Sequence, residues 1–415
     1  MIAPLSYGAL SATSANTIKG RAPTVQNSSL GFNVDGEDYS KAIGNIDPNV
    51  AKAFDAGLSL RHFTVMNLRN ADYYDADGDV AHSTTPFTTG TKSIKWYKSD
   101  GTEISDLNQL LGCGSNLGSV LTLKIKIQNI QAHSEHGDPR DSVPTTLEQS
   151  YKIAGSQGIC YVKPGSLKWD FHVNPAGVRS PTQGGGYTED FVPNKGFKAN
   201  PTVSNVKFPT TAFPRARFQL VMTGIQTDWN YSVITNPNSA VSVDANGWVT
   251  FNRKPTGAVT VRATSKSSSS TYFDYTFNPT SLWVVPRGDV NYASAKAECG
   301  GESKMATREQ LSNSPVSRIG QGGSFIFVND YTRAIGKLEI GGGEEPMKES
   351  IFSEWGSTAI IDGIPNAYPG SNWIGYSYWT REWYSPSRVF LVDCRSGRVG
   401  HNGPDNRGYY AVCIE

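Results

Sequence analysis

Residues 120–130, VLTLKIKIQNI, constrain the fold of this chain more than any other segment. Apolar side chains alternate there with polar ones: Leu121, Leu123, Ile125 and Ile127 against Thr122, Lys124 and Lys126. Successive side chains of a β-strand point to opposite faces, so this strict period of two predicts a strand with one buried face and one solvated face. The chain therefore needs a β-sheet that packs one side on a core.

Further segments between residues 201 and 280 have the length and composition of short strands: FQLVMTG, WNYSVIT, AVSVD, WVTFN, AVTVRATS and YFDYTF. Their spacing is typical of an all-β sandwich. Asn246-Gly247 separates two of them and predicts a hairpin with a type I′ turn, which needs positive φ at both central residues. Abundant glycine and tyrosine, 42 and 19 residues, agree with strands joined by tight turns.

Length and charge limit the organisation of the chain. At 415 residues it exceeds what one core usually organises, so several domains are expected. A formal net charge of +1 disfavours nucleic acid as a partner, because phosphate neutralisation needs a basic surface. No segment approaches the roughly 18 apolar residues of a membrane-spanning helix. The start, MIAPLSYGALSATSA, lacks the positive charge of a signal peptide, so we expect a fragment of a longer protein or an export signal elsewhere.

Residues 281–415 differ in character from the strand-rich text before them. NYASAKAECGG at 291–301 predicts a helix with Asp289 or Asn291 as its N-cap. A second helix is expected at Thr307–Leu311, and RVFLVDCRSG and YYAVCIE predict strands near the end. This part of the chain is therefore expected to form a mixed α/β domain.

Two parts of the chain resemble domains of known families. VSVDANGWVTF followed by GAVTVRATS resembles a bacterial Ig-like domain of group 2. A-x-A-x-x-x-C-G-G, MATREQL, SEWG, YWT, LVD and YYAVCI resemble a C-type-lectin-like domain, in the variant at the tips of invasin and intimin adhesins. DADGDV and KSIKWYKSDGTEI, nearer the N-terminus, resemble other Ig-like adhesin repeats more loosely.

The resemblance implies a mainly β protein, with tandem Ig-like β-sandwiches followed by a mixed α/β C-type-lectin-like domain. The expected parts are a flexible leader at 1–21, an Ig-like sandwich at 22–154, a strand-containing irregular connector at 155–200 or its inclusion in the next domain, a group-2 Ig-like domain at 201–280 and the lectin-like head at 281–415. It also implies display on a Gram-negative cell, secreted or anchored in the outer membrane. Attachment would then come through an N-terminal barrel that this chain lacks.

Five cysteines occur, and none forms a Cys-x-x-Cys pair. The resemblance implies a disulfide between Cys299 and Cys413, on the first helix and last strand of the head. Elimination then pairs Cys113 with Cys160 and leaves Cys394 as a buried thiol. Free thiols at these four positions are the alternative.

A loop-like stretch of the head combines aromatic, arginine and acidic side chains: Tyr376, Arg381, Glu382, Trp383, Tyr384 and Arg388. Tyrosine, tryptophan and arginine dominate the hot spots of protein interfaces, so we predict that these residues bind a partner. Trp355 and Trp379 match core positions of the family. The alternative for Trp383 is that it too fills the core.

Few residues in the sequence are candidates for metal ligands. Asp75, Asp77 and Asp79 have the oxygen density that calcium needs, but the longer loop and closing glutamate of an EF-hand are missing. Sugar-binding lectin heads hold calcium with Glu-Pro-Asn and Trp-Asn-Asp triplets, whereas this head has Glu345-Pro346-Met347 and Asn372-Trp373-Ile374. We therefore predict no cofactor and disfavour calcium-dependent sugar binding.

No catalytic constellation is found in the sequence. The six histidines are scattered, and no nucleophile elbow, phosphate-binding loop or metalloprotease helix occurs. Arg287-Gly288-Asp289 is a motif for integrin binding, but a given tripeptide also occurs by chance and Asp289 is a candidate helix cap, so we disfavour integrin binding through it. We predict an extracellular adhesin, not an enzyme, whose head binds a protein on a host or bacterial surface or in serum. The alternatives are a carbohydrate-binding lectin, with or without calcium, and an accessory of a secreted glycan or cell-wall hydrolase.

Overall fold

The computed structural model describes residues 20–114, 117–169, 185–314, 330–337, 349–359, 366–375 and 377–415. The chain divides into two compact units. The first contains residues 1–54, 58–111 and 120–154, and the second contains residues 55–57, 112–119 and 155–415. Strands dominate both units, which confirms the predicted mainly β class. Among the described residues, no helix is both long and apolar enough to cross a membrane.

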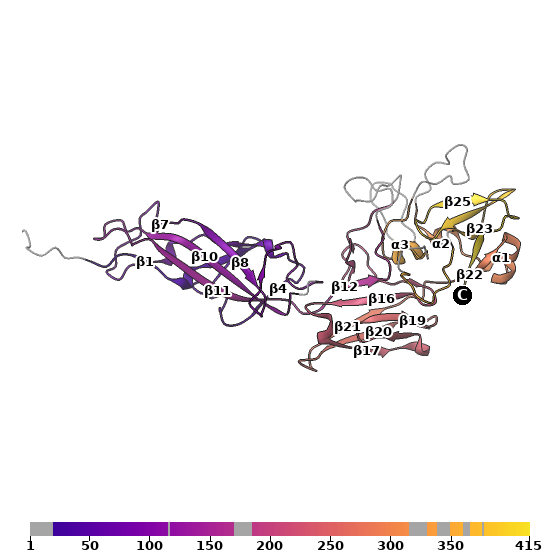
Figure 1. Cartoon of the computed structure of the whole chain (residues 1–415), viewed down its shortest axis with the longest axis horizontal. Coiled ribbons are helices and arrows are strands. Elements are labelled where there is room, and N and C mark those ends of the chain that lie inside the picture. The colour runs from indigo at the N-terminus through magenta and orange to yellow at the C-terminus, as the bar shows by residue number, and fades with distance from the viewer. Residues whose placement is uncertain are drawn as a thin grey trace, which may run out of the picture. The chain divides into compact units, whose positions relative to one another are not determined.

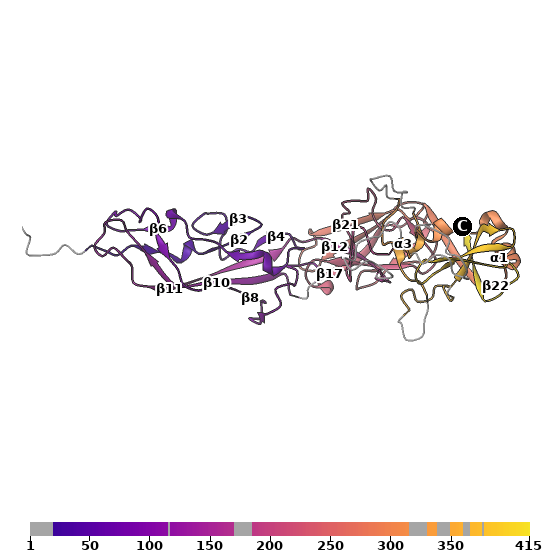
Figure 2. The ribbon, with the colours of Figure 1, turned by 90° about the horizontal axis from the view of Figure 1, so that it is seen from above.

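The first unit is built from short strands around one long pair (Figure 1). Its strands are β1 (Thr24–Val25), β2 (Gly31–Val34), β3 (Glu37–Ser40), β4 (Lys52–Phe54), β5 (Phe63–Val65), β6 (Tyr73–Tyr74), β7 (Phe87–Thr88), β8 (Lys92–Tyr97), β9 (Glu103–Ile104), β10 (Val120–Ala132) and β11 (Thr145–Gly155). Single 3-10 turns occur at Asn27–Ser29, Leu60–His62 and Asn70–Asp72. One sheet has the order β4-β11-β10-β8-β9, with β7 paired to β10, and a second has the order β3-β2-β5. Figure 2 shows β10 and β11 running side by side along this unit.

The alternating segment forms β10, as predicted. Leu121, Leu123, Ile125 and Ile127 are each at most 1% exposed. Leu123 lies opposite Trp96 of β8 and Tyr151 of β11. The rings of Trp96 and Tyr151 meet Phe63 and Phe32 from the second sheet, so the two sheets form a sandwich around an aromatic core. On the solvated face, Lys124 and Lys126 each pair with Glu148, at 2.7 and 3.0 Å.

The second unit begins with another sandwich. Its strands are β12 (Ile159–Pro164), β13 (Phe191–Val192), β14 (Gly196–Lys198), β15 (Thr211–Ala212), β16 (Arg217–Met222), β17 (Trp229–Thr235), β18 (Val241–Val243), β19 (Trp248–Phe251), β20 (Val259–Ser265) and β21 (Tyr272–Phe277). Single 3-10 turns occur at Gln226–Asp228 and Pro237–Ser239. The order β13-β14-β12-β16-β19-β18 makes one sheet and β17-β20-β21 the other. Three strands of the predicted connector, β12 to β14, therefore lie in the same sheet as β16.

A hairpin joins β18 to β19, as Asn246-Gly247 predicts, but the type I′ turn is wrong. Gly247 alone of the central residues has positive φ, at +78°. Its N–H donates to the carbonyl oxygen of Asp244 at 3.0 Å, and Asp244 N–H donates to Trp248 at 3.1 Å. The loop thus spans Asp244–Gly247, and this longer loop needs left-handed backbone only at its final residue.

The remainder of the second unit, which we call the head, is a six-stranded mixed sheet with short helices. Its elements are β22 (Leu282–Val290), α1 (Tyr292–Cys299), a 3-10 turn at Glu302–Lys304, α2 (Arg308–Leu311), α3 (Ile351–Trp355), β23 (Ser377–Ser385), β24 (Arg388–Asp393), β25 (Val399–Asn402) and β26 (Tyr409–Ile414). The sheet order is β15-β22-β26-β23-β24-β25, with β15–β22 and β26–β23 parallel. Asn291 caps α1 by accepting from Ser294 N–H at 2.9 Å, while Asp289 accepts from Gly408 N–H.

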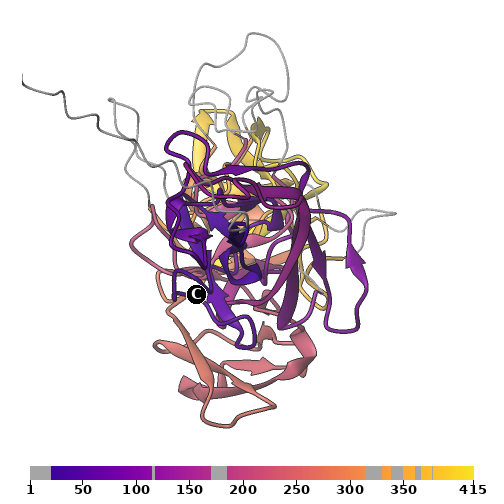
Figure 3. The same ribbon diagram turned by 90° about the vertical axis from the view of Figure 1, so that its left-hand side faces the viewer.

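Sandwich and head share one hydrophobic core. The same cluster of buried apolar side chains includes Val162 of β12 and Val412 of β26. Trp355 of α3 packs against Phe208 and Phe213 of the sandwich, with ring centroids 4.9 and 5.5 Å away. Strand β15 is a further link. It lies between the sandwich strands β14 and β16 in sequence, yet it pairs with β22 of the head. In Figures 1 and 3 the pink strands β17, β20 and β21 lie on the side of this unit away from the yellow C-terminal strands.

We expect native protein to resist protease cleavage between residues 277 and 288. Leu282, Trp283 and Val284 in this segment are at most 5% exposed and belong to β22, so a protease must first unfold the head. Limited proteolysis followed by N-terminal sequencing of the fragments measures this. Early cleavage within the segment, before any cut in the loop Ser267–Ser270, would contradict the shared core.

Candidate partner-binding surface on the head

The predicted binding residues lie on a β-hairpin and not in a loop. Arg381, Glu382, Trp383 and Tyr384 belong to β23, and Arg388 begins β24. Trp383 is in register with Val389, and Ser385 with Arg388. The register of this pair shifts twice, which interrupts the alternation by which a strand is recognised in sequence. Tyr376 is outside the described residues.

Trp383 is exposed but firmly held. Its side chain is 43% exposed, whereas Trp379 in the same strand is fully buried. The indole meets the ring of Tyr292 edge-on, with centroids 5.4 Å apart. Its Nε1–H donates to Glu302 Oε1 at 3.3 Å, and Tyr292 Oη donates to the same oxygen at 2.8 Å. The alternative that Trp383 fills the core is therefore wrong, because Trp379 occupies that place.

Tyr292 anchors this side of the hairpin. It is 2% exposed and packs on Trp379 from the first turn of α1. Burial, and then its hydrogen bond to Glu302, raise the pKa of Tyr292 far above the ordinary value. Its hydroxyl therefore remains a donor at any physiological pH, and Glu302 remains oriented toward Trp383. Neither residue was predicted as part of the site, because α1 and the following turn come together with β23 only in the folded head.

Tyr384 contacts a different set of residues. Its ring stacks on His401 of β25, with centroids 4.1 Å apart, and meets Phe390 of β24 edge-on at 5.5 Å. Arg388 Nη1 lies 3.4 Å from His401 Nδ1. Burial and then the charge of Arg388 lower the pKa of His401, so the imidazole is neutral and accepts from the guanidinium. The predicted group is thus divided, with Trp383 beside α1 and Tyr384 beside β25.

The acidic and basic members of the group are partly engaged within the chain. Glu382 Oε2 accepts from the backbone N–H of Arg308 at 2.8 Å. The backbone N–H of Arg381 donates to the carbonyl oxygen of Ala306 at 3.1 Å, and its side chain is exposed. Trp383 and Arg381 are therefore the predicted residues most available to a partner.

Other sequence candidates are occupied or outside the described residues. Arg287 pairs with Glu415 at 3.0 Å, and the Arg-Gly-Asp triplet lies within β22. Asp75 Oδ1 accepts from Asp77 N–H at 2.8 Å, while a carboxylate oxygen of Asp77 accepts from Arg21 N–H. In the part of the chain that the structure describes, including Asp79, no three acidic, histidine or cysteine side chains gather as metal ligands. Glu345-Pro346-Met347 lies outside that part, and Trp373 is fully buried.

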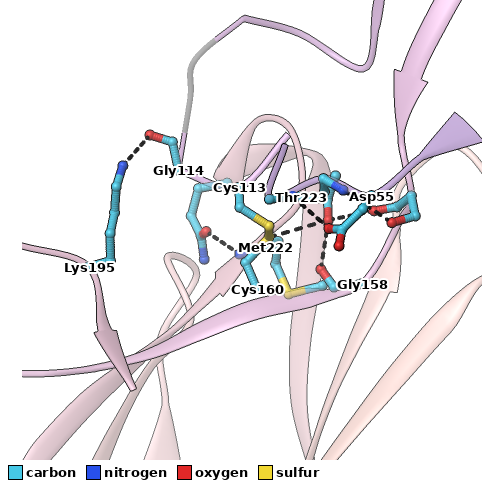
Figure 4. The surroundings of a disulfide bond; sticks show 12 residues. Asp55, Cys113, Gly114, Gly158, Cys160, Lys195, Met222 and Thr223 are labelled. Atoms are coloured by element: carbon cyan, nitrogen blue, oxygen red, sulfur yellow. Dashed lines mark hydrogen bonds between the residues drawn. A yellow bond between two sulfur atoms is a disulfide. The ribbon is translucent and has the colours of Figure 1, made fainter. Parts of the chain in front are cut away.

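Both predicted disulfides are present. Cys299 and Cys413 join α1 to β26 across 114 residues, a closure that stabilises by roughly 4–5 kcal/mol in the chain-entropy model. Cys113 and Cys160 are also bonded, beside Thr223 (Figure 4). Cys394 is the free, buried thiol that was predicted, and its Sγ donates to the carbonyl oxygen of Gly375 at 2.7 Å. Burial raises the pKa of Cys394 well above its usual value, so the group stays a thiol.

Comparison with known families adds an independent observation. Residues 190–277 match the family model of invasin, domain 4. The invasin domain 4 match begins inside the predicted connector and covers the strands from β13 to β21. It confirms the predicted resemblance to invasin- and intimin-type adhesins.

Solved structures of the same group resemble the chain at low sequence identity. An invasin structure, titled a bacterial integrin-binding protein, is 15% identical with a TM-score of 0.38, covering 94% of this chain and 60% of its own. The C-terminal 282-residue fragment of intimin, solved with the intimin-binding domain of the translocated intimin receptor, is 12% identical with a TM-score of 0.35, covering 79% and 100%. A mutant intimin of EHEC O157:H7 is 19% identical with a TM-score of 0.31, covering 51% and 92%. The chain thus spans 60% of the invasin structure that it matches. Comparison with curated proteins finds none that matches.

Proposed function

We propose that this chain is the extracellular, non-catalytic part of a bacterial adhesin whose head binds a protein on a host or bacterial surface or in serum. The assignment of residues 22–154 as an Ig-like sandwich and of 281–415 as a C-type-lectin-like head belongs to this proposal. So does display at the cell surface, either anchored in the outer membrane or secreted. The exposed, firmly held side chain of Trp383 is the observation that carries it.

A rigid exposed tryptophan suits protein recognition for two reasons. Full burial of a large apolar side chain stabilises by about 1.5–3 kcal/mol, and the 43% exposure of Trp383 leaves much of that gain to a partner. The contacts with Tyr292 and Glu302 already restrict the indole, so little side-chain entropy is lost on binding. Arg381, exposed on the same strand, offers the partner a guanidinium group.

The nature of the partner is tested by treating the target cells before binding. Fluorescently labelled full chain is added to cultured epithelial cells and to Gram-negative cells, either untreated, shaved with protease or treated with glycosidases. We expect binding to be lost after protease and retained after glycosidases. Loss after glycosidases alone would contradict a protein receptor and favour the lectin alternative.

A further inference from the structure

Two carboxyl groups of the second unit meet at one hydroxyl group. Glu354 Oε1, on α3, lies 2.7 Å from Thr210 Oγ1, directly before β15. Glu349 Oε1 contacts the same hydroxyl oxygen and also Ser281 Oγ, directly before β22. These four side chains therefore join the segment leading into α3 to the chain on both sides of the sandwich–head junction.

The hydrogen atoms available do not satisfy this arrangement if both carboxyl groups are ionised. The Thr210 hydroxyl has one hydrogen and can donate to only one of the two carboxylates. Ser281 Oγ also lies 2.8 Å from the carbonyl oxygen of Thr210, so its single hydrogen has two acceptors as well. Two hydroxyl hydrogens thus serve four close oxygen–oxygen contacts, and a proton on one carboxyl group supplies a third hydrogen.

The remaining contacts of Glu354 are all donors. Backbone N–H groups of Thr210, Thr211 and Gly336 lie 2.9–3.1 Å from its two oxygens, and Thr211 Oγ1 lies 2.7 Å from Oε2. The backbone N–H groups can only donate a hydrogen bond, whereas a hydroxyl group can both donate and accept one. A proton between the two glutamates must therefore pass along the line from carboxyl to Thr210 hydroxyl to carboxyl.

We propose that Glu349 and Glu354 share one proton through Thr210 Oγ1 and thereby form a pH-sensitive latch that holds the head against the sandwich. The latch comprises Glu349, Glu354, Thr210 and Ser281. Binding of the proton supplies a hydrogen to a third contact among the four oxygen–oxygen contacts in the latch. Release of the proton leaves two negatively charged carboxylates in contact with one hydroxyl group at the junction.

The surroundings of the latch favour proton binding. Glu354 is fully buried, and this burial raises its pKa to about 7; hydrogen bonds from Thr210 and Thr211 act in the opposite direction, and the charge of Glu349 adds to the rise. Charged and titratable groups packed nearby are Arg333, whose Nη2 donates to the Glu354 carbonyl oxygen, the Tyr275 hydroxyl, and Lys207 and Lys337 on the adjacent pocket wall. No side-chain cation within the described residues hydrogen-bonds or pairs with either carboxylate.

Water can reach the latch. Thr210, Ser281 and Glu349 line a pocket of about 840 Å³ in the second unit. The pKa of Glu354 lies above its ordinary value of 4.5, so the folded protein retains a proton that the unfolded chain releases. The stabilisation is therefore complete below about pH 4.5 and is lost as the pH rises through about 7. Across this window the unfolding equilibrium constant is expected to rise by up to about tenfold per pH unit.

The latch is tested on the full chain by thermal melts and native-state hydrogen exchange at pH 5, 6, 7 and 8. Glu349→Gln is the informative variant, because its amide can donate to Thr210 Oγ1 and leave the threonine hydrogen for Glu354. We expect this variant to be more stable than wild type at pH 8 and to show a weaker pH dependence, because the charge of Glu349 no longer raises the pKa of Glu354. Glu298→Gln, at an exposed position of α1, is the matched control and is expected to keep the wild-type dependence.

Hydrogen exchange keeps the test decisive if Glu349→Gln fails to fold. In wild type, exchange at the Thr211 and Gly336 amides, corrected for its intrinsic pH dependence, is expected to accelerate by up to about tenfold per unit from pH 5 to 7. Equal exchange across that range, or equal pH dependence of wild type and Glu349→Gln, would overturn the proposal. So would stabilisation by 1 mM Ca²⁺ that Glu349→Gln abolishes, since the pair would then hold a cation in place of a proton.

Discussion

Replacing Glu354 by alanine is expected to lower the free energy of unfolding by about 3–5 kcal/mol, because it leaves buried polar groups without partners. The backbone N–H groups of Thr210, Thr211 and Gly336 all donate to this carboxylate, which is itself fully buried. Each buried donor left unsatisfied costs about 1–3 kcal/mol, offset in part by the removal of a costly buried charge. Chemical denaturation of the full chain, monitored by tryptophan fluorescence, measures the loss.

The matched control for this substitution is Glu298→Ala. Glu298 is exposed on α1, so its removal is expected to change stability by less than about 0.5 kcal/mol. If the unfolding transitions of the Glu354→Ala and Glu298→Ala variants coincide, the three N–H groups find other hydrogen-bond partners. The assignment of Glu354 as the polar centre of the junction would then be wrong.

Replacing Trp383 by alanine is expected to weaken partner binding by about 2 kcal/mol, a loss of about thirtyfold, with little change in melting temperature. The indole is 43% exposed, and its described contacts are the edge of Tyr292 and one hydrogen bond to Glu302. Its removal opens no cavity in the core, unlike truncation of the fully buried Trp379, which is expected to cost about 3–5 kcal/mol of stability. Titration of labelled chain onto target cells, beside a thermal melt, measures both effects.

Tyr384→Ala separates the two sides of the hairpin. Tyr384 stacks on His401 away from Trp383, so its truncation is expected to leave binding within about twofold if the partner contacts the side beside α1. Loss of binding in Tyr384→Ala, with normal binding in Trp383→Ala, would move the contact surface to the side of Tyr384 and Arg388. A lowered melting temperature in Trp383→Ala would assign the indole a structural role.

Some of these features were predictable because they depend on neighbours in sequence. The alternation at Leu121–Ile127 identifies β10, since the geometry of a strand relates each residue to the one two positions away. The Asn246-Gly247 pair identifies the hairpin between β18 and β19 for the same local reason, although the exact turn depends on where pairing stops. The pairing of Cys299 with Cys413 is implied by the resemblance of the head to a known family, and the structure contains that bond.

The hairpin of β23 and β24 is an element that local sequence patterns do not predict. Arg381, Glu382, Trp383 and Tyr384 mix polar and aromatic residues without a period of two, so their pattern predicts a loop. Pairing with β24 makes them a strand, and contacts with α1 and β25 decide which side chain is exposed. Trp379 and Trp383 are the same residue type four positions apart, yet one is buried and the other 43% exposed.

The sequence by itself determined the mainly β class, the alternating strand and the family resemblance, because these depend on local geometry and on short motifs. Only the tertiary structure decided that Glu349 and Glu354 meet at Thr210, 139 and 144 residues away in the chain. The physical reason is that burial and hydrogen-bond partners are set by packing between distant segments. A glutamate in IFSEWG has no local feature that distinguishes a solvated carboxylate from one with several buried donors.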